Sequence, residues 1–396
     1  MMEVLKGKQV VMEDGHKPVF FRLSHTNDRM RLEDLLNTKP HVWVHDRIMD
    51  QLQELVRTQD PRLTRRQDIQ QAAIAHLGDL PAEEYGVWVY YPWSNRLVHL
   101  LDEEEFKLVR TDRNRNKITR EEQRILSTKK VGVIGLSVGQ SVSLTMALER
   151  SFGEIRLADH DTLELSNLNR IRSGVHGMGV NKAVNVAREI AEIDPFLKVT
   201  CYKEGITREN MHDFFTEGGK LNVLIEECDS VDIKILARLK ARELGVPVVM
   251  DTSDRGLVDV ERFDLEPDRP LLHGNLEGLD LSVVGRPMTN EEKLPLMGRI
   301  VGLDTISERM KTSIPEIGRS LITWPQLASG VILGGALVGD VWRRIALDQF
   351  QGSGRWWNDP SDNIRVEPNV RPAARSATDQ NQDHGQDNAT RVQSSR

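Results

Sequence analysis

Apolar residues from position 130 onward recur in short dense runs, separated by longer stretches with helical spacing. The short runs predict strands, which fall at residues 131–134, 154–158, 198–202, 221–225 and 247–250. The longer stretches place apolar residues three or four positions apart and predict helices, which fall at residues 141–151, 180–193 and 231–244. Strands that alternate with helices usually pair in parallel. We therefore expect an α/β fold with a mostly parallel sheet covered by helices.

The first 110 residues have a different pattern. Residues 46–57 carry a helical stripe of five apolar side chains, which are Ile48, Met49, Leu52, Leu55 and Val56. Residues 87–91 and 97–101 are typical of strands, and the segment between them is typical of a hairpin turn. We expect residues 1–110 to form a small α+β domain, for which the sequence indicates no role.

The pattern changes again after residue 251. Residues 256–263 alternate apolar and polar side chains, which predicts an exposed antiparallel strand, and residues 264–320 contain scattered Pro and Gly and predict irregular structure. A helix is predicted over residues 325–347. Its small residues allow another helix to approach closely, either within the subunit or across a dimer, and they are Gly330, Gly334, Gly335 and Gly339.

These patterns divide the chain into a main domain over residues 111–350 and an extension over residues 351–396. The extension has no aromatic residue from position 371, and we expect it to be disordered from about there because it cannot bury enough surface. The adjacent tryptophans Trp356 and Trp357 are typical either of a docking surface or of a pair that covers a core.

Charge and cysteine content narrow the function classes. The 396 residues include 53 Lys and Arg and 60 Asp and Glu, a net charge of −7, which argues against nucleic-acid and membrane-surface partners. The N-terminus lacks the pattern of a signal peptide, and the most apolar run, residues 327–339, is too short to cross a bilayer, so we expect a cytoplasmic protein. Two cysteines, Cys201 and Cys228, exclude a disulfide scaffold and a zinc site of four cysteines.

A glycine-containing loop joins the first predicted strand of the main domain to a helix. Gly135, Ser137 and Gly139 belong to this loop, where backbone N–H groups and the helix N-terminus can hold phosphates. Asp159 ends the next strand, where a carboxylate can accept hydrogen bonds from ribose hydroxyls. The loop departs from GxGxxG, because Ser137 and Gln140 interrupt it. It is therefore typical either of a Rossmann-like nucleotide site, with an NAD(P)-dependent dehydrogenase as the ordinary guess, or of a tight turn only.

Four further side chains favour chemistry at a phosphate. Asn167, Arg170 and Lys182 follow Asp159, and Asp229 follows the fourth strand. Hydride transfer does not need this set of groups. Phosphoryl and nucleotidyl transfer do, because their charge spreads over phosphate oxygens and must be met by fixed cations and a metal.

The spacing of Asp159, Asp161, Asn167 and Arg170, followed by Lys182, resembles the ThiF/MoeB/E1 superfamily of ATP-dependent adenylating enzymes. The resemblance covers about residues 113–265, and again the helix from residue 325. The order of the whole chain resembles the Rv1355c-type branch of ThiF-like proteins, in which the ThiF domain is often fused to a nitroreductase-like domain.

The resemblance implies a role for each of these residues. Asp159 would hold the ribose hydroxyls of ATP, Asn167 and Arg170 would contact the phosphates, and Lys182 would balance charge on the α-phosphate. Asp229 would hold Mg²⁺, a hard cation suited to carboxylate oxygens. The remaining residues of the implied nucleotide site are Gly135, Ser137, Gly139 and Asp161.

The family also implies an arginine that reaches into the partner subunit's active site. Arg115 is the best match, with Arg113 as the fallback, and the active enzyme would then be at least a homodimer. Taken without the resemblance, residues 110–120 are typical of a solvated linker.

The activity implied is attack by a carboxylate on the α-phosphorus of ATP, which gives an acyl adenylate and pyrophosphate. The carboxylate would belong to a ubiquitin-like or sulfur-carrier protein, a peptide or a small acid. The alternatives are a non-catalytic ThiF-like nucleotide-binding scaffold and, less favoured, an NAD(P)-dependent oxidoreductase.

Three departures from the family affect these expectations. The loop has lost a usual glycine. No cysteine follows Cys228, which we expect to be a small buried residue, so the acyl group should pass directly to an outside thiol, persulfide or amine. The family's zinc cysteines are missing, so residues 264–320 should be held by packing alone.

Two further features keep alternatives open. Residues 251–255 follow the fifth strand and are typical either of a wall of the acceptor groove or of a polar turn. His160 and His176 fit structural or solvent-facing positions better than metal sites, because no second histidine stands at ligand spacing.

Overall fold

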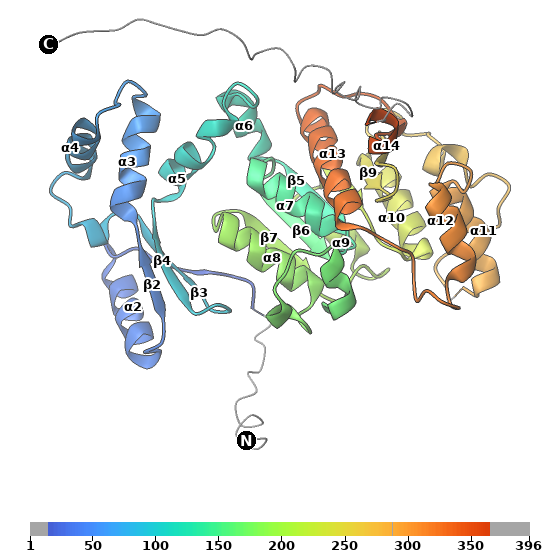
Figure 1. Cartoon of the computed structure of the whole chain (residues 1–396), viewed down its shortest axis with the longest axis horizontal. Coiled ribbons are helices and arrows are strands. Elements are labelled where there is room, and N and C mark those ends of the chain that lie inside the picture. The colour runs from blue at the N-terminus through green and yellow to red at the C-terminus, as the bar shows by residue number, and fades with distance from the viewer. Residues whose placement is uncertain (1–14, 287, 365–396) are drawn as a thin grey trace, which may run out of the picture. The chain divides into compact units, whose positions relative to one another are not determined.

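The computed structural model describes residues 15–286 and 288–364 (Figure 1). The chain divides into two units, Met1–Asn358 and Asp359–Arg396, and the second is described only across a short helix, α14 (Pro360–Asn363). The disorder expected from about residue 371 lies outside the described residues. No helix in the described ranges combines the length and the apolar character that a membrane crossing needs.

The N-terminal region contains a four-stranded sheet with the order β1-β3-β4-β2. The helix and the two strands predicted here are confirmed, whereas three helices (α2, α4 and α5) and two strands (β1 and β2) were missed. Strand β2 is exposed along its whole length and pairs in parallel with β4. The bounds are β1 (Val19–Phe21), α2 (Thr26–Thr38), β2 (Trp43–Asp46), α3 (Ile48–Gln59), α4 (Arg66–Leu77), β3 (Val87–Tyr91), β4 (Arg96–Leu100) and α5 (Glu103–Arg110).

The larger sheet has seven strands in the order β11-β10-β9-β8-β5-β6-β7. Strands β5 to β9 pair in parallel, and they are the five strands predicted from the sequence. The strands are β5 (Lys130–Ile134), β6 (Glu154–Ala158), β7 (Lys198–Tyr202), β8 (Val223–Glu226), β9 (Val248–Asp251), β10 (Leu257–Glu261) and β11 (Gly354–Trp357). The helices are α6 (Arg120–Leu126), α7 (Gly139–Glu149), α8 (Lys182–Ile193), α9 (Met211–Thr216), α10 (Val231–Leu244) and α13 (Ala328–Ala346). The expected α/β fold, a mostly parallel sheet covered by helices, is confirmed.

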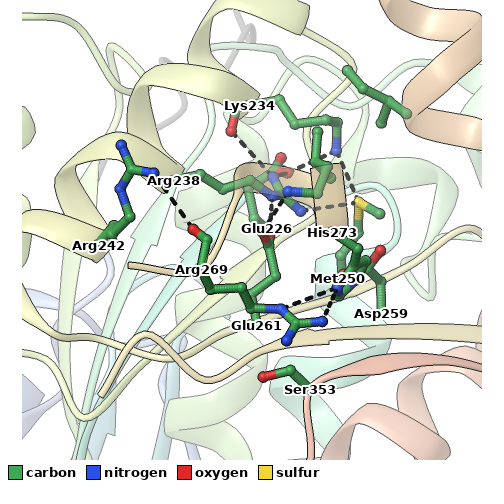
Figure 2. A network of polar contacts seen from close by, with 12 residues as sticks. Glu226, Lys234, Arg238, Arg242, Met250, Asp259, Glu261, Arg269, His273 and Ser353 are labelled. Carbon is green, nitrogen blue, oxygen red and sulfur yellow. Dashed lines mark hydrogen bonds and ion pairs between the residues drawn. The ribbon is translucent and has the colours of Figure 1, made fainter. Parts of the chain in front are cut away.

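The prediction of an exposed strand at residues 256–263 is wrong. Strand β10 is antiparallel, as expected, but every residue in it is buried between β9 and β11. Val258 and Val260 pack into the apolar core with residues of α13. Asp259 and Glu261 are buried as well, because basic side chains meet them in an ion network (Figure 2). The alternation of apolar and polar residues therefore reflects a strand with two buried faces, one apolar and one charged.

The prediction of irregular structure over residues 264–320 is wrong in part. This segment contains α11 (Asn290–Val301) and α12 (Glu308–Ser313). A capping box of Thr289 with Glu292 starts α11, and Pro295 inside that helix concealed its pattern. Leu296 and Ile300 of α11 are buried in an apolar cluster. The segment is not held by packing alone, as was expected, because His273 pairs with Asp259 at 3.0 Å and the Ser307 hydroxyl donates to Asp254 at 2.8 Å.

The small residues of α13 bring this helix against α7 within the same subunit (Figure 1). A Cβ atom on Gly335 would lie 2.8 Å from the carbonyl carbon of Ser141, a backbone atom of α7 that cannot move away. At Gly339 it would lie 3.2 Å from the Thr145 methyl group, which can adjust. The alternative of close packing within the subunit is therefore confirmed.

This contact predicts that Gly335→Ala destabilises the protein by about 1–3 kcal/mol, the usual cost of overpacking, despite the helix propensity of alanine. Gly339→Ala is the matched control, and we expect its free energy of unfolding to stay within about 1 kcal/mol of wild type. Urea unfolding of both variants checks this. Equal stability of the two would contradict the proposed fit of α13 against α7.

Candidate functional site

The loop between β5 and α7 packs against the backbone of the segment that follows β8. Gly135 has a φ of +86°, and a Cβ atom there would lie 2.6 Å from the backbone nitrogen of Cys228. Only glycine fits this position. Gly139 opens α7, where a Cβ atom would lie 2.7 Å from a methyl group of Val133. The two glycines that the loop retains are therefore those that its packing requires.

Asp159 lies at the end of β6 and holds this loop in place. One of its carboxylate oxygens accepts a hydrogen bond from the backbone N–H of Leu136 at 2.7 Å, and the other accepts one from the N–H of Asp161 at 2.9 Å. Burial raises the pKa of Asp159, while these two hydrogen bonds oppose the shift. Each oxygen keeps a lone pair for a further donor, such as a ribose hydroxyl.

Lys182 is the first residue of α8, and it is buried. Its ammonium group donates to the carboxylate of Asp161 at 2.9 Å, and its backbone N–H donates to the Asp161 carbonyl. The side chain of Asn181 caps the helix by accepting from the N–H groups of Ala183 and Val184. These contacts fix the lysine at the edge of the sheet. The ion pair lowers the pKa of Asp161, although burial opposes it.

A pocket of about 180 Å³ opens where β5, β6 and β8 end, and we call it the phosphate pocket. It brings together six of the predicted site residues, which are Gly135, Ser137, Asp159, Asp161, Lys182 and Asp229. The carboxyl ends of neighbouring parallel strands meet at one edge of a sheet, which explains why residues so far apart in the sequence converge here.

Asn167 and Arg170 lie in the turn after β6, and neither lines the phosphate pocket. Asn167 is buried, and its amide oxygen accepts from the N–H of Glu164 at 3.0 Å, so it shapes the turn. Arg170 donates to the side chain of Asn169 at 3.0 Å, whereas its buried Nε atom has no hydrogen-bond partner among the described residues. Burial lowers the pKa of Arg170, and the charge of Asp229 opposes that shift.

Arg115 lies apart from the phosphate pocket of its own chain. It lines a different pocket, of about 380 Å³, and pairs with Asp112 at 2.6 Å. Arg113 is exposed. The structure therefore offers no role for either arginine in the phosphate pocket of the same subunit.

A second pocket, of about 270 Å³, lies beyond the segment that follows β8, and we call it the second pocket. Glu227, Cys228 and Asp229 line both pockets and so form the wall between them. The side of the second pocket next to β9 includes residues 251–253, so the predicted polar segment does line a groove. Burial raises the pKa of the Cys228 thiol well above its usual value, which agrees with the expectation that it is not a nucleophile.

Two groups near the site were missed from the sequence. Gln140, which interrupts the glycine pattern, is buried, and its side-chain amide bonds to both the N–H and the carbonyl of Arg172, at 2.7 and 2.8 Å. It thereby fixes the segment after Arg170. Glu227 is buried and accepts from the N–H of Asp251 at 2.9 Å. No pattern in a single sequence predicts that a glutamine at the start of a helix will be buried. None predicts that Glu227 and Asp251, which are 24 residues apart, will meet.

The part of the chain that holds the phosphate pocket matches a known protein family. The ThiF family model covers residues 111–273 of this chain. Residues 111–273 are a ThiF family domain. The match includes the whole phosphate pocket and agrees with the expected resemblance over about residues 113–265, but it does not reach the helix from residue 325.

Two curated relatives extend the comparison. The uncharacterized protein MT1398 of Mycobacterium tuberculosis (strain CDC 1551 / Oshkosh) is 41% identical over 346 residues, which are 87% of this chain and 45% of that protein. The chain thus spans less than half of that relative. The tRNA threonylcarbamoyladenosine dehydratase of Bacillus subtilis (strain 168) is 24% identical over 255 residues, which are 60% of this chain and 97% of the enzyme. A solved structure of the corresponding E. coli enzyme, TcdA, aligns with 63% of this chain and 98% of its own, with 16% identity and a TM-score of 0.44.

Proposed function

We propose that the ThiF domain binds ATP in the phosphate pocket and transfers its adenylyl group to a carboxylate, which gives an acyl adenylate and pyrophosphate. The observation that carries the proposal is the convergence of a buried lysine and the carboxyl groups of Asp159, Asp161 and Asp229 on the glycine loop, in one pocket at the carboxyl edge of the sheet. The charge of this set suits a nucleotide with a metal ion better than it suits a nicotinamide.

Each group then has a task in the reaction. The carboxylate of Asp159 orients the ribose, and the loop at Gly135 holds the phosphates against backbone N–H groups. Lys182 meets the charge that builds up on the α-phosphate as the substrate oxygen attacks. Arg170, whose Nε has no partner in the part of the chain that the structure describes, supplies a donor for the phosphates beside the pocket. No covalent intermediate with the protein is needed.

The carboxylate of Asp229 is the group that would hold Mg²⁺. Mg²⁺ is commonly held by one or two carboxylates together with substrate phosphates, so a single acid at the mouth of the phosphate pocket fits it. When bound, the ion would neutralise charge on the phosphate oxygens. The cluster of Asp159, His160 and Asp161 fits less well, because Asp159 already accepts two backbone hydrogen bonds and Asp161 pairs with Lys182.

The trans arginine and the homodimer belong to the same proposal. The position of Arg115, outside the phosphate pocket of its own subunit, is the one that a residue serving a partner would have. The acceptor is proposed only as a carboxylate. Relatives of this domain include the adenylyltransferase and sulfurtransferase MOCS3 of Dictyostelium discoideum and the tRNA threonylcarbamoyladenosine dehydratase of Bacillus subtilis. Their names point to different substrates and do not select one acceptor for this chain.

Exchange of labelled pyrophosphate into ATP, in the presence of candidate carboxylates, tests the proposal directly. We expect at least one acid to support exchange, and Asp229→Ala and Arg170→Ala each to lower it at least tenfold. The first removes the carboxylate that would hold Mg²⁺, and the second removes a cation that meets phosphate charge. Asp232→Ala is the matched control, because this half-buried aspartate lies outside both pockets. ATP binding without exchange for any acid would favour the nucleotide-binding scaffold, and binding of NAD(H) in place of ATP would favour the oxidoreductase.

A further inference from the structure

A pocket of about 600 Å³ lies where the N-terminal sheet meets the ThiF domain, and we call it the arginine pocket. Its walls come from the turn between β3 and β4, from residues 172–180 and from α8. The indole N–H of Trp93 in that turn donates to Glu192 of α8 at 2.6 Å and joins the two sides. None of its described lining residues belongs to the phosphate pocket or to the second pocket. A molecule bound here would therefore occupy a separate site, at the kind of junction where ligand pockets often form.

Three arginines line the arginine pocket, and each comes from a different segment of the chain. Arg96 is the first residue of β4, Arg172 follows the turn after β6, and Arg188 lies on α8. The guanidinium group of Arg188 lies over the ring of Trp93, 5.6 Å from its centroid, and its Nε atom donates to the Gly15 carbonyl at 2.9 Å. Within the described ranges, the guanidinium groups of Arg96 and Arg172 have neither an ion pair nor a hydrogen bond. Two charges of the pocket are therefore available to a ligand.

The two acids that line the pocket offset this positive charge only in part. Glu192 is engaged by the indole N–H of Trp93. Glu189 accepts hydrogen bonds from the side-chain amides of Gln140 at 2.9 Å and Asn185 at 3.0 Å. Burial raises the pKa of Glu189 to about 7, so near that pH about half of the molecules carry this group uncharged. Three arginine charges thus face one full and one partial negative charge, and the pocket favours an anion.

The backbone that carries Arg172 is held by two helices. Gln140 of α7 binds both the N–H and the carbonyl of Arg172 through its side-chain amide, at 2.7 and 2.8 Å. The hydroxyl of Ser173 donates to the side chain of Asn185 of α8 at 3.1 Å. An anchored backbone lowers the entropy that is lost when a ligand binds. Guanidinium groups donate two parallel hydrogen bonds to one phosphate or carboxylate, so arginines on separate segments suit a ligand with more than one such group.

We propose that the arginine pocket binds a small polyanion, a molecule that carries two or more neighbouring phosphate or carboxylate groups. Arg96 and Arg172 pair with its anionic groups, and Arg188 adds positive charge from the side of α8. The volume of the pocket admits a ligand of up to nucleotide size. The site goes beyond the proposed adenylation, because the pocket lies apart from the residues that would hold ATP.

Calorimetric titration of the full chain with tripolyphosphate tests the proposal, with AMP present to keep the probe out of the phosphate pocket. We expect tripolyphosphate to bind, and Arg96→Met and Arg172→Met each to lower its affinity about tenfold or more, since each removes a charge-assisted pair. Arg66→Met is the matched control, because this exposed arginine of α4 has no ion pair among the described residues and lies outside the pocket. Tripolyphosphate binding that Arg96→Met and Arg172→Met leave unchanged would belong to another site and would overturn the proposal, as would no binding at all.

Citrate and inorganic phosphate, titrated in the same way, identify the anion. Tighter binding of citrate than of tripolyphosphate would support a polycarboxylate as the ligand, and the reverse order would support a phosphate compound. Inorganic phosphate offers a single anionic group, so we expect it to bind about tenfold more weakly than the better of the two. Equal affinity for all three anions would contradict a site built for several groups.

Removal of an acid from the pocket should have the opposite effect to removal of an arginine. At pH 8 most of the Glu189 carboxyl groups are ionised, so Glu189→Gln should raise the affinity for tripolyphosphate about threefold or more. Glutamine keeps an oxygen that can accept from Gln140 and Asn185, so both hydrogen bonds can remain. A loss of folding would lower the affinity in every variant and cannot produce this rise. Lower affinity in Glu189→Gln, with an unchanged melting temperature, would show that the pocket does not hold an anion.

Discussion

Replacing Lys182 by methionine should lower pyrophosphate exchange about 10²- to 10³-fold, the usual cost of removing one charged donor from a transition state of this kind. Methionine keeps the length and most of the apolar volume of lysine, so the start of α8 should remain folded. The ammonium group is the cation that lines the phosphate pocket among the described residues, and no other side chain there can replace it. Exchange rates at saturating ATP, together with ATP affinity, measure the effect.

The control for Lys182 should be another ion-paired lysine on the same sheet. Lys198 pairs with Glu154 at 2.9 Å, the same distance as in the pair of Lys182 with Asp161, but it lies at the opposite end of the strands. Lys198→Met should leave exchange within twofold of wild type. Asp161→Asn removes the partner and keeps the lysine, and we expect a loss smaller than that of Lys182→Met. An equal loss in Lys182→Met and Lys198→Met would mean that the lysine acts only through stability.

The residues of the phosphate pocket could be predicted because two simple regularities place them. Dense apolar runs identified the parallel strands, and the residues that end neighbouring parallel strands must meet at one edge. Asp159 and Asp229 follow β6 and β8 in this way, and Lys182 opens the helix that crosses back over the sheet. Arg170 and Asn167 were expected in the same pocket, but the structure places them in the adjoining turn.

The second pocket could not be predicted from the sequence. Its walls come from residues 138, 227–234, 250–253, 297–301 and 317–326, which only the tertiary fold brings together. The prediction that β10 is exposed failed for a related reason, because charged residues that alternate with apolar ones usually mark the solvent face of a strand. Asp259 and Glu261 are buried instead, since arginines from other elements neutralise them. A pattern of single residues carries no information about such partners.

Those buried charges make Arg238 the position where a substitution should cost the most stability. Arg238 lies on α10 and is fully buried (Figure 2). It donates to Glu261 of β10 at 2.7 Å, and it also pairs with Glu226 of β8. Lys234 pairs with Glu226 at 2.7 Å, and the N–H of Cys228 donates to the other oxygen of Glu226 at 2.9 Å. The network therefore ties α10 to the sheet and to the wall between the two pockets.

Arg238→Met should lower the free energy of unfolding by about 3–5 kcal/mol, because it leaves Glu226 and Glu261 buried with too little positive charge. Urea unfolding measures this. Arg343→Met, which removes a partly exposed arginine paired with Glu149 at 2.7 Å, is the control and should cost no more than about 1 kcal/mol. Arg238→Met combined with Glu261→Gln should recover part of the loss, since one stranded charge is then removed.

The same substitution should show a characteristic pH dependence. Burial alone would raise the pKa of Glu226, but the charges of Lys234 and Arg238 lower it from 4.5 to about 2. A carboxyl whose pKa is lowered by folding stabilises the protein above its unfolded value, and that contribution is lost as the pH falls through the folded value. The stability difference between wild type and Arg238→Met should therefore be largest above pH 4.5 and shrink toward pH 2. A difference that stays constant over this range would mean that Arg238 stabilises the fold through packing of its side chain and not through the charge of Glu226.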